Sequence, residues 1–143
     1  MTYDIMISRK CRKIIKIKHP IDIFNCLKRY SRCRQEHFLV LTLNGAHEVI
    51  SIHISTIGLV NKTVVHPREI FIHAINDNAV AIIVAHNHPS GSLKPSDEDN
   101  DISERLNEAC KIMGIHFLDH LIISKSGYYS YKESGKISEE IFN

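Results

Sequence analysis

The chain has 143 residues, 43% of them hydrophobic and 24% charged, and a net charge of +2. This length is typical of one domain and the composition of an ordinary soluble globular protein, while the small net charge does not by itself indicate nucleic-acid binding. Basic residues nevertheless gather near the N-terminus, at Arg9, Lys10, Arg12, Lys13, Lys16 and Lys18. We expect residues 1–19 to form a basic arm, either solvated or in contact with phosphates such as those of DNA.

Cysteine spacing and the lengths of apolar runs exclude several classes of protein. The cysteines (Cys11, Cys26, Cys33 and Cys110) form no C-x-x-C pair, which argues against a cysteine zinc site. The N-terminus has no charged-then-apolar leader. The longest apolar run, Ala79 to Ala85, is too short to cross a bilayer. We therefore expect a cytoplasmic protein with reduced thiols and no membrane partner.

The first half of the chain predicts a helix followed by a β-hairpin. Pro20 suits the first turn of a helix, and Ile21, Phe24 and Leu27 follow at helical spacing until about Arg32. The stretch "EHFLVLTL" is rich in apolar and β-branched residues and predicts a buried strand. "NGA" is typical of a hairpin turn, and the alternation in "EVISIHIST" predicts the returning strand.

The second half predicts helices and strands in alternation. "HPREIFIHAINDNA" predicts a helix that starts at Pro67, and the apolar "AVAIIVAH" predicts a strand that is buried on both faces. "SDEDNDISERLNEACKIMG" predicts a long helix that stops at Gly114. "IHFLDHLIIS" and "GYYSYKE" predict two strands joined by a turn. The order α-β-β-α-β-α-β-β predicts an α/β fold, a mixed sheet covered by helices, over residues 20–133 with a tail at 134–143.

The loop after the apolar strand carries residues that could bind a metal ion. His86 and His88 alternate along an extended backbone, so both side chains point to the same side. Asp99 lies in the first turn of the next helix, and the loop between them, which contains Pro89 and Gly91, can bring it back to the histidines. Two histidines and one carboxylate leave a fourth tetrahedral position open, as in catalytic zinc sites.

The same residues also allow an interpretation without a metal. Ser96 and Asp99 have the spacing of a capping box, in which they would only start the helix. His86 and His88 would then be polar residues at the exit of a strand. The spacing alone leaves both interpretations open, and Ser96 can serve both, by capping the helix and by directing its hydroxyl into the site.

A wider set of motifs resembles a known family. The stretch from His86 to Asp99 is similar to the H-x-H-x7-S-x2-D pattern of JAMM metalloproteases. His86 and His88 match the two histidines of the pattern, Ser96 matches the serine and Asp99 the aspartate. The chain also resembles the RadC family, whose members carry a JAB/MPN domain. This similarity runs from about Gln35 to Glu133 and is carried by the motifs "HPREIF", "HNHPSG", "KPSDED" and "LDHLII". The resemblance implies the JAB/MPN (cytidine-deaminase-like) architecture and a bound Zn²⁺ ion.

The resemblance also implies roles for individual residues. His86, His88 and Asp99 match the zinc ligands, and Ser96 matches the serine whose hydroxyl supports the tetrahedral intermediate. The general acid/base of JAMM proteins is a glutamate at the start of an early strand, a position that Glu36 occupies here. Its rival is Glu69 in the "HPREIF" helix, where an acid more often faces solvent.

The function implied in this way is that of a metallohydrolase. We expect a zinc-dependent enzyme that cleaves peptide or isopeptide bonds of a peptide or protein substrate with metal-activated water. The alternative is a binding module associated with DNA repair or mobile elements, or a metal-dependent nuclease with the same ligands. Zinc deaminases are excluded because H-x-E and P-C-x-x-C are absent. Asp119 and His120 are predicted to form a buried hydrogen-bonded pair that supports the sheet.

Overall fold

The computed structural model describes residues 3–5, 13–59 and 65–137, and in these ranges six strands form one sheet in the order β1-β3-β2-β4-β5-β6. The strands are β1 (Tyr3–Ile5), β2 (His37–Leu43), β3 (Val49–Ile57), β4 (Ala81–Asn87), β5 (His116–Ser124) and β6 (Gly127–Ser130). β4 and β5 are parallel, and the other neighbouring pairs are antiparallel. The predicted mixed sheet is therefore confirmed.

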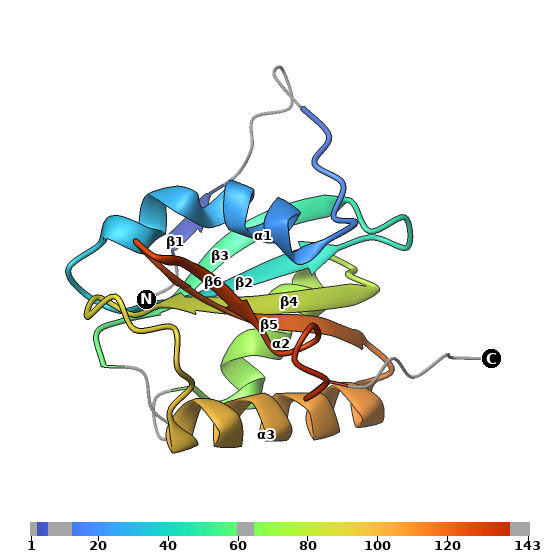
Figure 1. Ribbon diagram of the computed structural model, residues 1–143. Helices are drawn as coiled ribbons and strands as arrows, with labels where there is room; N and C mark the ends of the chain where they lie inside the picture. The colour runs from blue at the N-terminus through green and yellow to red at the C-terminus, as the bar shows by residue number, and fades with distance from the viewer. Residues whose placement is uncertain (1–2, 6–12, 60–64, 138–143) are drawn as a thin grey trace.

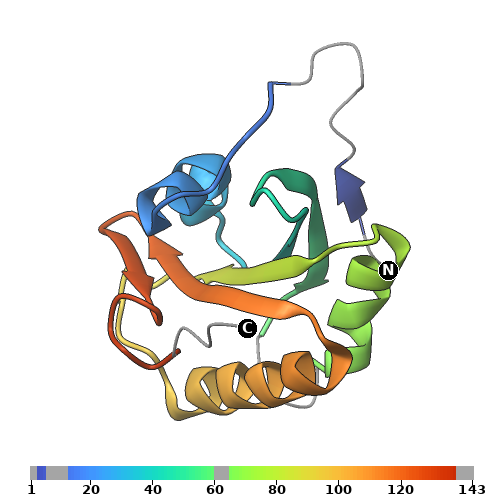
Figure 2. The ribbon, with the colours of Figure 1, turned by 90° about the vertical axis from the view of Figure 1, so that its right-hand side faces the viewer.

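Helices cover both faces of this sheet. On one face lie α1 (Pro20–Leu27) and the short 3₁₀ helix η2 (Lys28–Arg32), and on the other lie α2 (Pro67–Asn76) and α3 (Asp97–Met113) (Figures 1 and 2). The result is an α/β fold of three layers, with β2, β4 and β5 between the helical layers.

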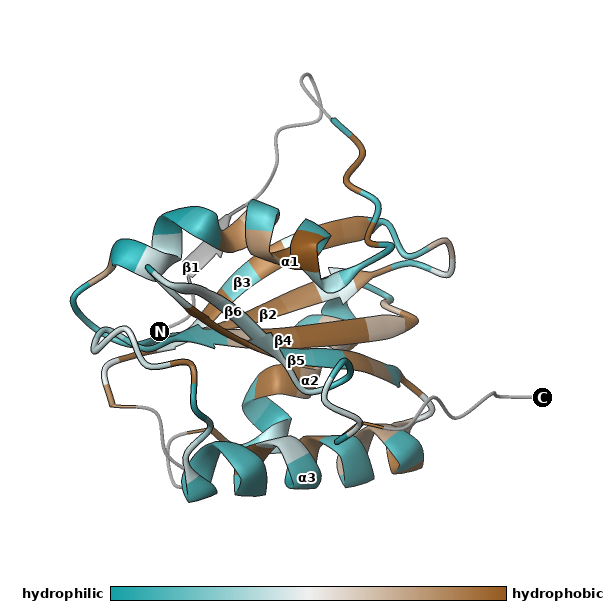
Figure 3. Cartoon of the chain, in the orientation of Figure 1, coloured by the Kyte–Doolittle hydropathy of each residue, from teal (hydrophilic) through white to brown (hydrophobic). Residues whose placement is uncertain are grey.

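The strands alternate between two apolar cores, one on each face. The odd-numbered residues from Leu39 to Leu43 in β2 and from Ala81 to Ala85 in β4 pack with Ile23 and Leu27 of α1. Phe38, Val40, Ile82 and Val84 pack instead with α2 and α3. All seven residues of β4 are buried, which confirms the prediction for this strand. Figure 3 shows the hydrophobic strands in the middle layer and the hydrophilic outer side of α3.

Local signals explain where α3 begins and ends and where α2 begins. The hydroxyl oxygen of Ser96 accepts the backbone N–H of Asp99, and the Asp99 carboxylate accepts the backbone N–H of Ser96, so the predicted capping box is present at the start of α3. Gly114 ends α3 with a φ of 69°, a left-handed conformation that glycine adopts without steric cost. In α2, Pro67 occupies the first turn, as predicted.

The structure differs from the predictions at three places. β1 was not predicted, and it pairs with β3 at the edge of the sheet. The single helix expected from Pro20 to Arg32 changes to a 3₁₀ helix after Leu27, whose ψ of 5° departs from α-helical geometry. β6 ends at Ser130, because the Ser130 hydroxyl and the backbone N–H of Lys132 both turn toward the Asp119 carboxylate and bend the chain out of the sheet.

The described end of the basic arm lies against the β2–β3 turn. The backbone N–H of Ile17 donates to the carbonyl oxygen of His47 at 2.9 Å, and the Ile17 side chain is buried. The side chains of Lys13, Lys16 and Lys18 are exposed. Arg9, Lys10 and Arg12 lie outside the described residues. None of the helices in the described ranges has the length and apolar character that a membrane span requires.

Candidate metal centre

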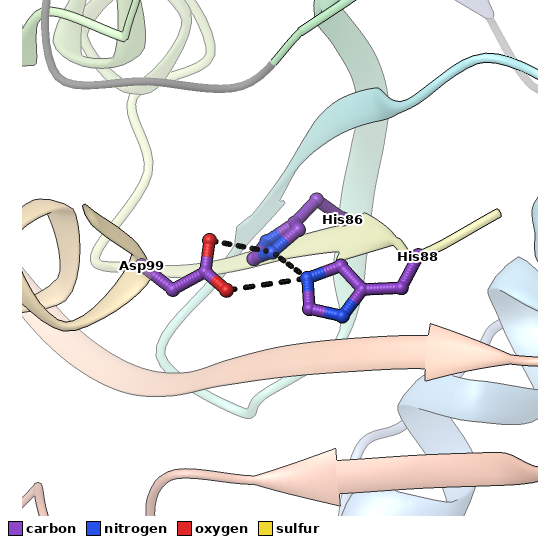
Figure 4. Close-up of side chains that lie close together, drawn as sticks. All are labelled: His86, His88 and Asp99. Atoms are coloured by element: carbon purple, nitrogen blue, oxygen red, sulfur yellow. Dashed lines mark hydrogen bonds and ion pairs between the residues drawn. The ribbon is translucent and has the colours of Figure 1, made fainter. Parts of the chain in front are cut away.

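Three side chains meet where β4 ends and α3 begins. His86 is the sixth residue of β4, His88 follows the strand, and Asp99 lies in the first turn of α3. The Nε2 atom of His86 lies 3.1 Å from Nε2 of His88 and 3.1 Å from Oδ1 of Asp99, and Nε2 of His88 lies 3.2 Å from Oδ2 of Asp99. Figure 4 shows the three side chains pointing toward one another. The predicted convergence of these residues is therefore present.

This geometry fits a bound metal ion. Ligand atoms at the corners of a tetrahedron around zinc, about 2.0–2.1 Å from the ion, are about 3.3 Å apart, and the three separations here are 3.1–3.2 Å. Within the described ranges this is the one group of three or more histidine, cysteine and acidic side chains whose ligand atoms lie close enough to hold an ion together. The His86, His88 and Asp99 cluster could thus bind a metal through two nitrogens and one oxygen.

Hydrogen bonds outside the cluster orient the His88 ring. Its Nδ1 lies 2.9 Å from the carbonyl oxygen of Ser92, which can only accept, so Nδ1 carries a proton. In the neutral ring the lone pair is then on Nε2, the atom that faces the cluster. The loop that supplies Ser92 is held in turn, because the hydroxyl groups of Ser124 and Ser126 donate to the carbonyl of Gly91 at 3.0 and 3.3 Å.

His86 is oriented by a second imidazole that the sequence did not indicate. His86 is fully buried, and its ring is stacked on Phe38 with 5.8 Å between ring centroids. Its Nδ1 lies 3.1 Å from Nε2 of His120, which is also fully buried and is stacked on Tyr131. Burial lowers the pKa of His120 well below its usual value, so this ring is neutral. If Nε2 of His86 binds a metal, its Nδ1 carries the proton and donates to His120.

Asp119 and His120 are both buried and are joined by a hydrogen bond from the backbone N–H of His120 to the Asp119 carboxylate, 2.7 Å long. They are adjacent residues of β5, so their side chains point to opposite faces of the sheet. The His120 imidazole consequently contacts His86 and not Asp119. Asp119 supports the sheet, as predicted, through Ser130 and Lys132 of the β6 end.

The three ligand side chains also shift one another's protonation. Burial by itself would raise the pKa of the Asp99 carboxyl, but hydrogen bonds with His86 and His88 hold it well below its usual range. The hydrogen bond to Asp99 raises the pKa of His88, against the effect of burial, and the charge of Glu36 contributes in the same direction. The carboxylate is therefore ionised and ready to accept a cation, and a metal must compete with a proton at His88.

Ser96 bonds to the backbone of Asp99, and the charge of Glu36 acts on His88. Ser96 is exposed, and its hydroxyl oxygen accepts the backbone N–H of Asp99, which leaves the hydroxyl hydrogen for another acceptor. Glu36 is half-buried and precedes β2 by one residue. Continuing the alternation of β2 by two residues puts Glu36 on the face of Phe38, whose ring stacks on His86. The alternative candidate, Glu69, is exposed on α2, and its Oε1 atom lies 3.9 Å from Nε of Arg68.

The sequence of this chain is similar to those of known proteins. A family model described as RadC-like JAB domain matches residues 17–136. The chain is 55% identical to a UPF0758 protein of Methanospirillum hungatei over 122 residues, which cover 85% of this chain and 51% of that protein. It is 49% identical to a UPF0758 protein of Alkaliphilus metalliredigens, over 82% of this chain and 51% of the relative. The chain thus spans about half the length of these curated relatives.

Removal of each ligand should abolish metal binding, with different effects on stability. We expect that isothermal titration calorimetry will detect no binding of a divalent ion to His86→Ala, His88→Ala or Asp99→Ala. Asp99→Ala should also destabilise the metal-free protein by about 1 kcal/mol in urea unfolding, since the capping box is lost. Ser96→Ala is the matched control, because it should show a similar loss of stability and keep the metal. Full metal binding by Asp99→Ala would contradict the assignment.

His120 should affect metal affinity without being a ligand. His120→Phe keeps a flat ring beside Tyr131 but removes the nitrogen that faces His86, so the apparent metal affinity should fall by about 10- to 100-fold. Competition with a chromophoric chelator measures this change. Thermal unfolding of the metal-free variant reports any packing defect separately. An unchanged affinity would show that the contact between His86 and His120 has no influence on the metal.

Proposed function

Because the chain belongs to the family of RadC-like JAB domains, we propose that it is a zinc-dependent hydrolase of peptide or isopeptide bonds. The observation that carries this proposal is the convergence of two imidazole nitrogens and one carboxylate at the end of β4, with Glu36 at the start of the neighbouring strand. A structural zinc site would use all four tetrahedral positions, whereas this set of three leaves one position for water or substrate.

Zinc is the ion that this donor set favours. Imidazole nitrogen suits zinc, copper, iron and nickel, whereas calcium and magnesium prefer sites made of oxygen alone. Two nitrogens and one oxygen at nearly tetrahedral separations match the mixed nitrogen and oxygen sets of catalytic zinc. When bound, the ion would polarise the substrate carbonyl and lower the pKa of a water molecule to about 7.

The residues of this chain then carry the proton and stabilise the developing charge. In the proposed reaction Glu36 takes a proton from the attacking water as the new carbon–oxygen bond forms. It returns this proton to the nitrogen of the leaving amine when the carbon–nitrogen bond breaks. The Ser96 hydroxyl, whose hydrogen is not used in the helix cap, donates to the negatively charged carbonyl oxygen. His120 and Ser92 keep the two histidines in the orientation that ligation needs.

The general acid/base can be tested separately from the ligands. Glu36→Gln keeps the shape of the side chain and leaves all three ligands, so zinc should remain bound while hydrolysis falls by roughly 100-fold or more. The assay uses internally quenched peptides together with a peptide branched through a lysine isopeptide bond. Glu69→Gln is the matched control and should retain the rate. Loss of zinc from Glu36→Gln, or an unchanged rate, would contradict the role of Glu36.

A second candidate function is binding of nucleic acid through the basic arm. The observation that favours it is the exposure of Lys13, Lys16 and Lys18, three cations within six residues. Such a surface can neutralise phosphates and release counterions, which makes binding strongly dependent on salt. In this case the JAB domain would bring its substrate site to DNA, or would itself cleave DNA with the same ligands.

Salt-dependent DNA binding distinguishes this candidate. We expect fluorescence anisotropy with a labelled duplex to show that affinity falls with salt. Changing Lys13, Lys16 and Lys18 to Gln should reduce the slope of log K against log salt by about 0.9 for each phosphate that the arm no longer neutralises. The control changes three exposed lysines elsewhere, Lys94, Lys111 and Lys125, to Gln. Equal effects of both triple variants would argue against a specific role of the arm, and cleavage of the duplex with zinc present would indicate a nuclease.

A further inference from the structure

Asn87 lies between the two histidines of the metal centre, but its side chain points to the opposite face of the sheet. Side chains of a strand alternate between faces, so His86 faces α3 whereas Asn87 faces η2. Asn87 is fully buried, and none of the three atoms that meet in the candidate metal site belongs to it. The contribution of Asn87 to the site must therefore come from its contacts on the η2 side of β4.

The Asn87 side chain forms hydrogen bonds with the backbone on both sides of Glu36. Its Oδ1 accepts the backbone N–H of His37 at 2.6 Å. Its Nδ2 donates to the carbonyl oxygen of Gln35 at 2.9 Å and to that of Cys33 at 3.3 Å. A carboxamide suits this place because one small planar group supplies the acceptor and both donors. The peptide groups before and after Glu36 are thereby tied to the end of β4.

The backbone of Glu36 is also held from the other neighbouring strand. The backbone N–H of Gly58, directly after β3, donates to the carbonyl oxygen of Glu36 at 2.8 Å. On the β4 side the ladder of β2 ends with the pair Phe38–His86, and the Asn87 side chain extends the contact by one residue. The backbone of Glu36 is thus anchored between β3 and β4.

We propose that Asn87 is a positioning residue that holds Glu36 beside the cluster of His86, His88 and Asp99. The inference rests on the role proposed for Glu36 in hydrolysis. A general base must come within about 2.6–3.2 Å of the proton it takes, and a displacement of about 1 Å can reduce the rate by roughly 100-fold. Neighbouring residues at the end of β4 thus have different roles in this proposal. The imidazoles of His86 and His88 bind the ion, and the Asn87 amide between them positions Glu36.

Two substitutions remove this anchor in different ways. Asn87→Leu removes the whole amide with little change in size, and Asn87→Asp keeps an acceptor for His37 but loses the donors to Gln35 and Cys33. We expect both variants to bind Zn²⁺ with unchanged affinity, because all ligand atoms lie on the other face. By NMR, exchange of the His37 amide in Asn87→Leu should become roughly tenfold faster or more relative to the Val40 amide in the middle of β2. In crystals of the zinc-loaded variants, Glu36 should be displaced while the three ligands keep their places.

A matched control separates positioning from a general loss of stability. Thr42 is fully buried in the same β2 strand, and its hydroxyl donates to Asp77 at 2.6 Å at the far end from the site. Thr42→Val also removes a buried hydrogen bond with little change in size, and should leave both Glu36 and the relative exchange of the His37 amide unchanged. Equal exchange changes in Thr42→Val and Asn87→Leu, a loss of zinc affinity in the Asn87 variants, or an undisplaced Glu36 would each overturn the proposal.

Kinetics give a readout that a purely structural role of Asn87 would not move. With the quenched peptides, Asn87→Leu should lower kcat by roughly tenfold or more with KM unchanged, and should have no further effect in a Glu36→Gln background. Equal losses in both backgrounds would overturn the proposal. If the unmodified zinc-loaded protein hydrolyses none of the peptides, the proposed function fails, and the His37 exchange and the position of Glu36 in the crystals still decide whether Asn87 holds Glu36.

Discussion

The burial of β4 on both faces is the constraint on which the rest of the site depends. Every residue of this strand is buried, so any polar side chain in it needs a hydrogen-bond partner or destabilises the fold by about 1–3 kcal/mol. The last two residues of the strand, His86 and Asn87, meet this requirement in opposite directions. His86 contacts α3 and β5, whereas Asn87 contacts the backbone that leads into β2. The end of one strand thereby adds side-chain hydrogen bonds to α3, to β5 and to the segment before β2.

The connection between β4 and β5 determines which residues come together there. Parallel strands need a crossover, and α3 provides it. Because α3 starts close to the end of β4, its first turn brings Asp99 beside the histidines, and the partial positive charge of the helix N-terminus favours the ionised carboxylate. β5 then runs alongside β4 and places His120 next to His86. The three side chains that could bind a metal and the imidazole that supports them all belong to one strand–helix–strand unit, whereas Glu36 comes from an earlier part of the chain.

The sequence predicted those features whose signals are local. The apolar run of β4, the alternation that puts His86 and His88 on one side, and the capping box at Ser96 and Asp99 each depend on a few neighbouring residues, and the structure contains them. The contact of His120 with His86 was not predictable, because it depends on the register between β4 and β5. The hydrogen bonds of Asn87 to residues about fifty positions earlier were missed for the same reason. β1 is too short to carry an alternating pattern of its own.

The Asp99 carboxylate has two structural tasks, and this limits which residues can replace it. One carboxylate accepts the backbone N–H of Ser96 to start α3 and also faces both histidines. An asparagine at position 99 would keep an acceptor for the helix cap but bring no negative charge to the imidazoles. A glutamate would keep the charge but place it one methylene farther from the helix start. The start of α3 and the cluster of His86, His88 and Asp99 are therefore coupled, and a descendant of this chain that lost the Asp99 carboxylate would also need a new way to begin α3.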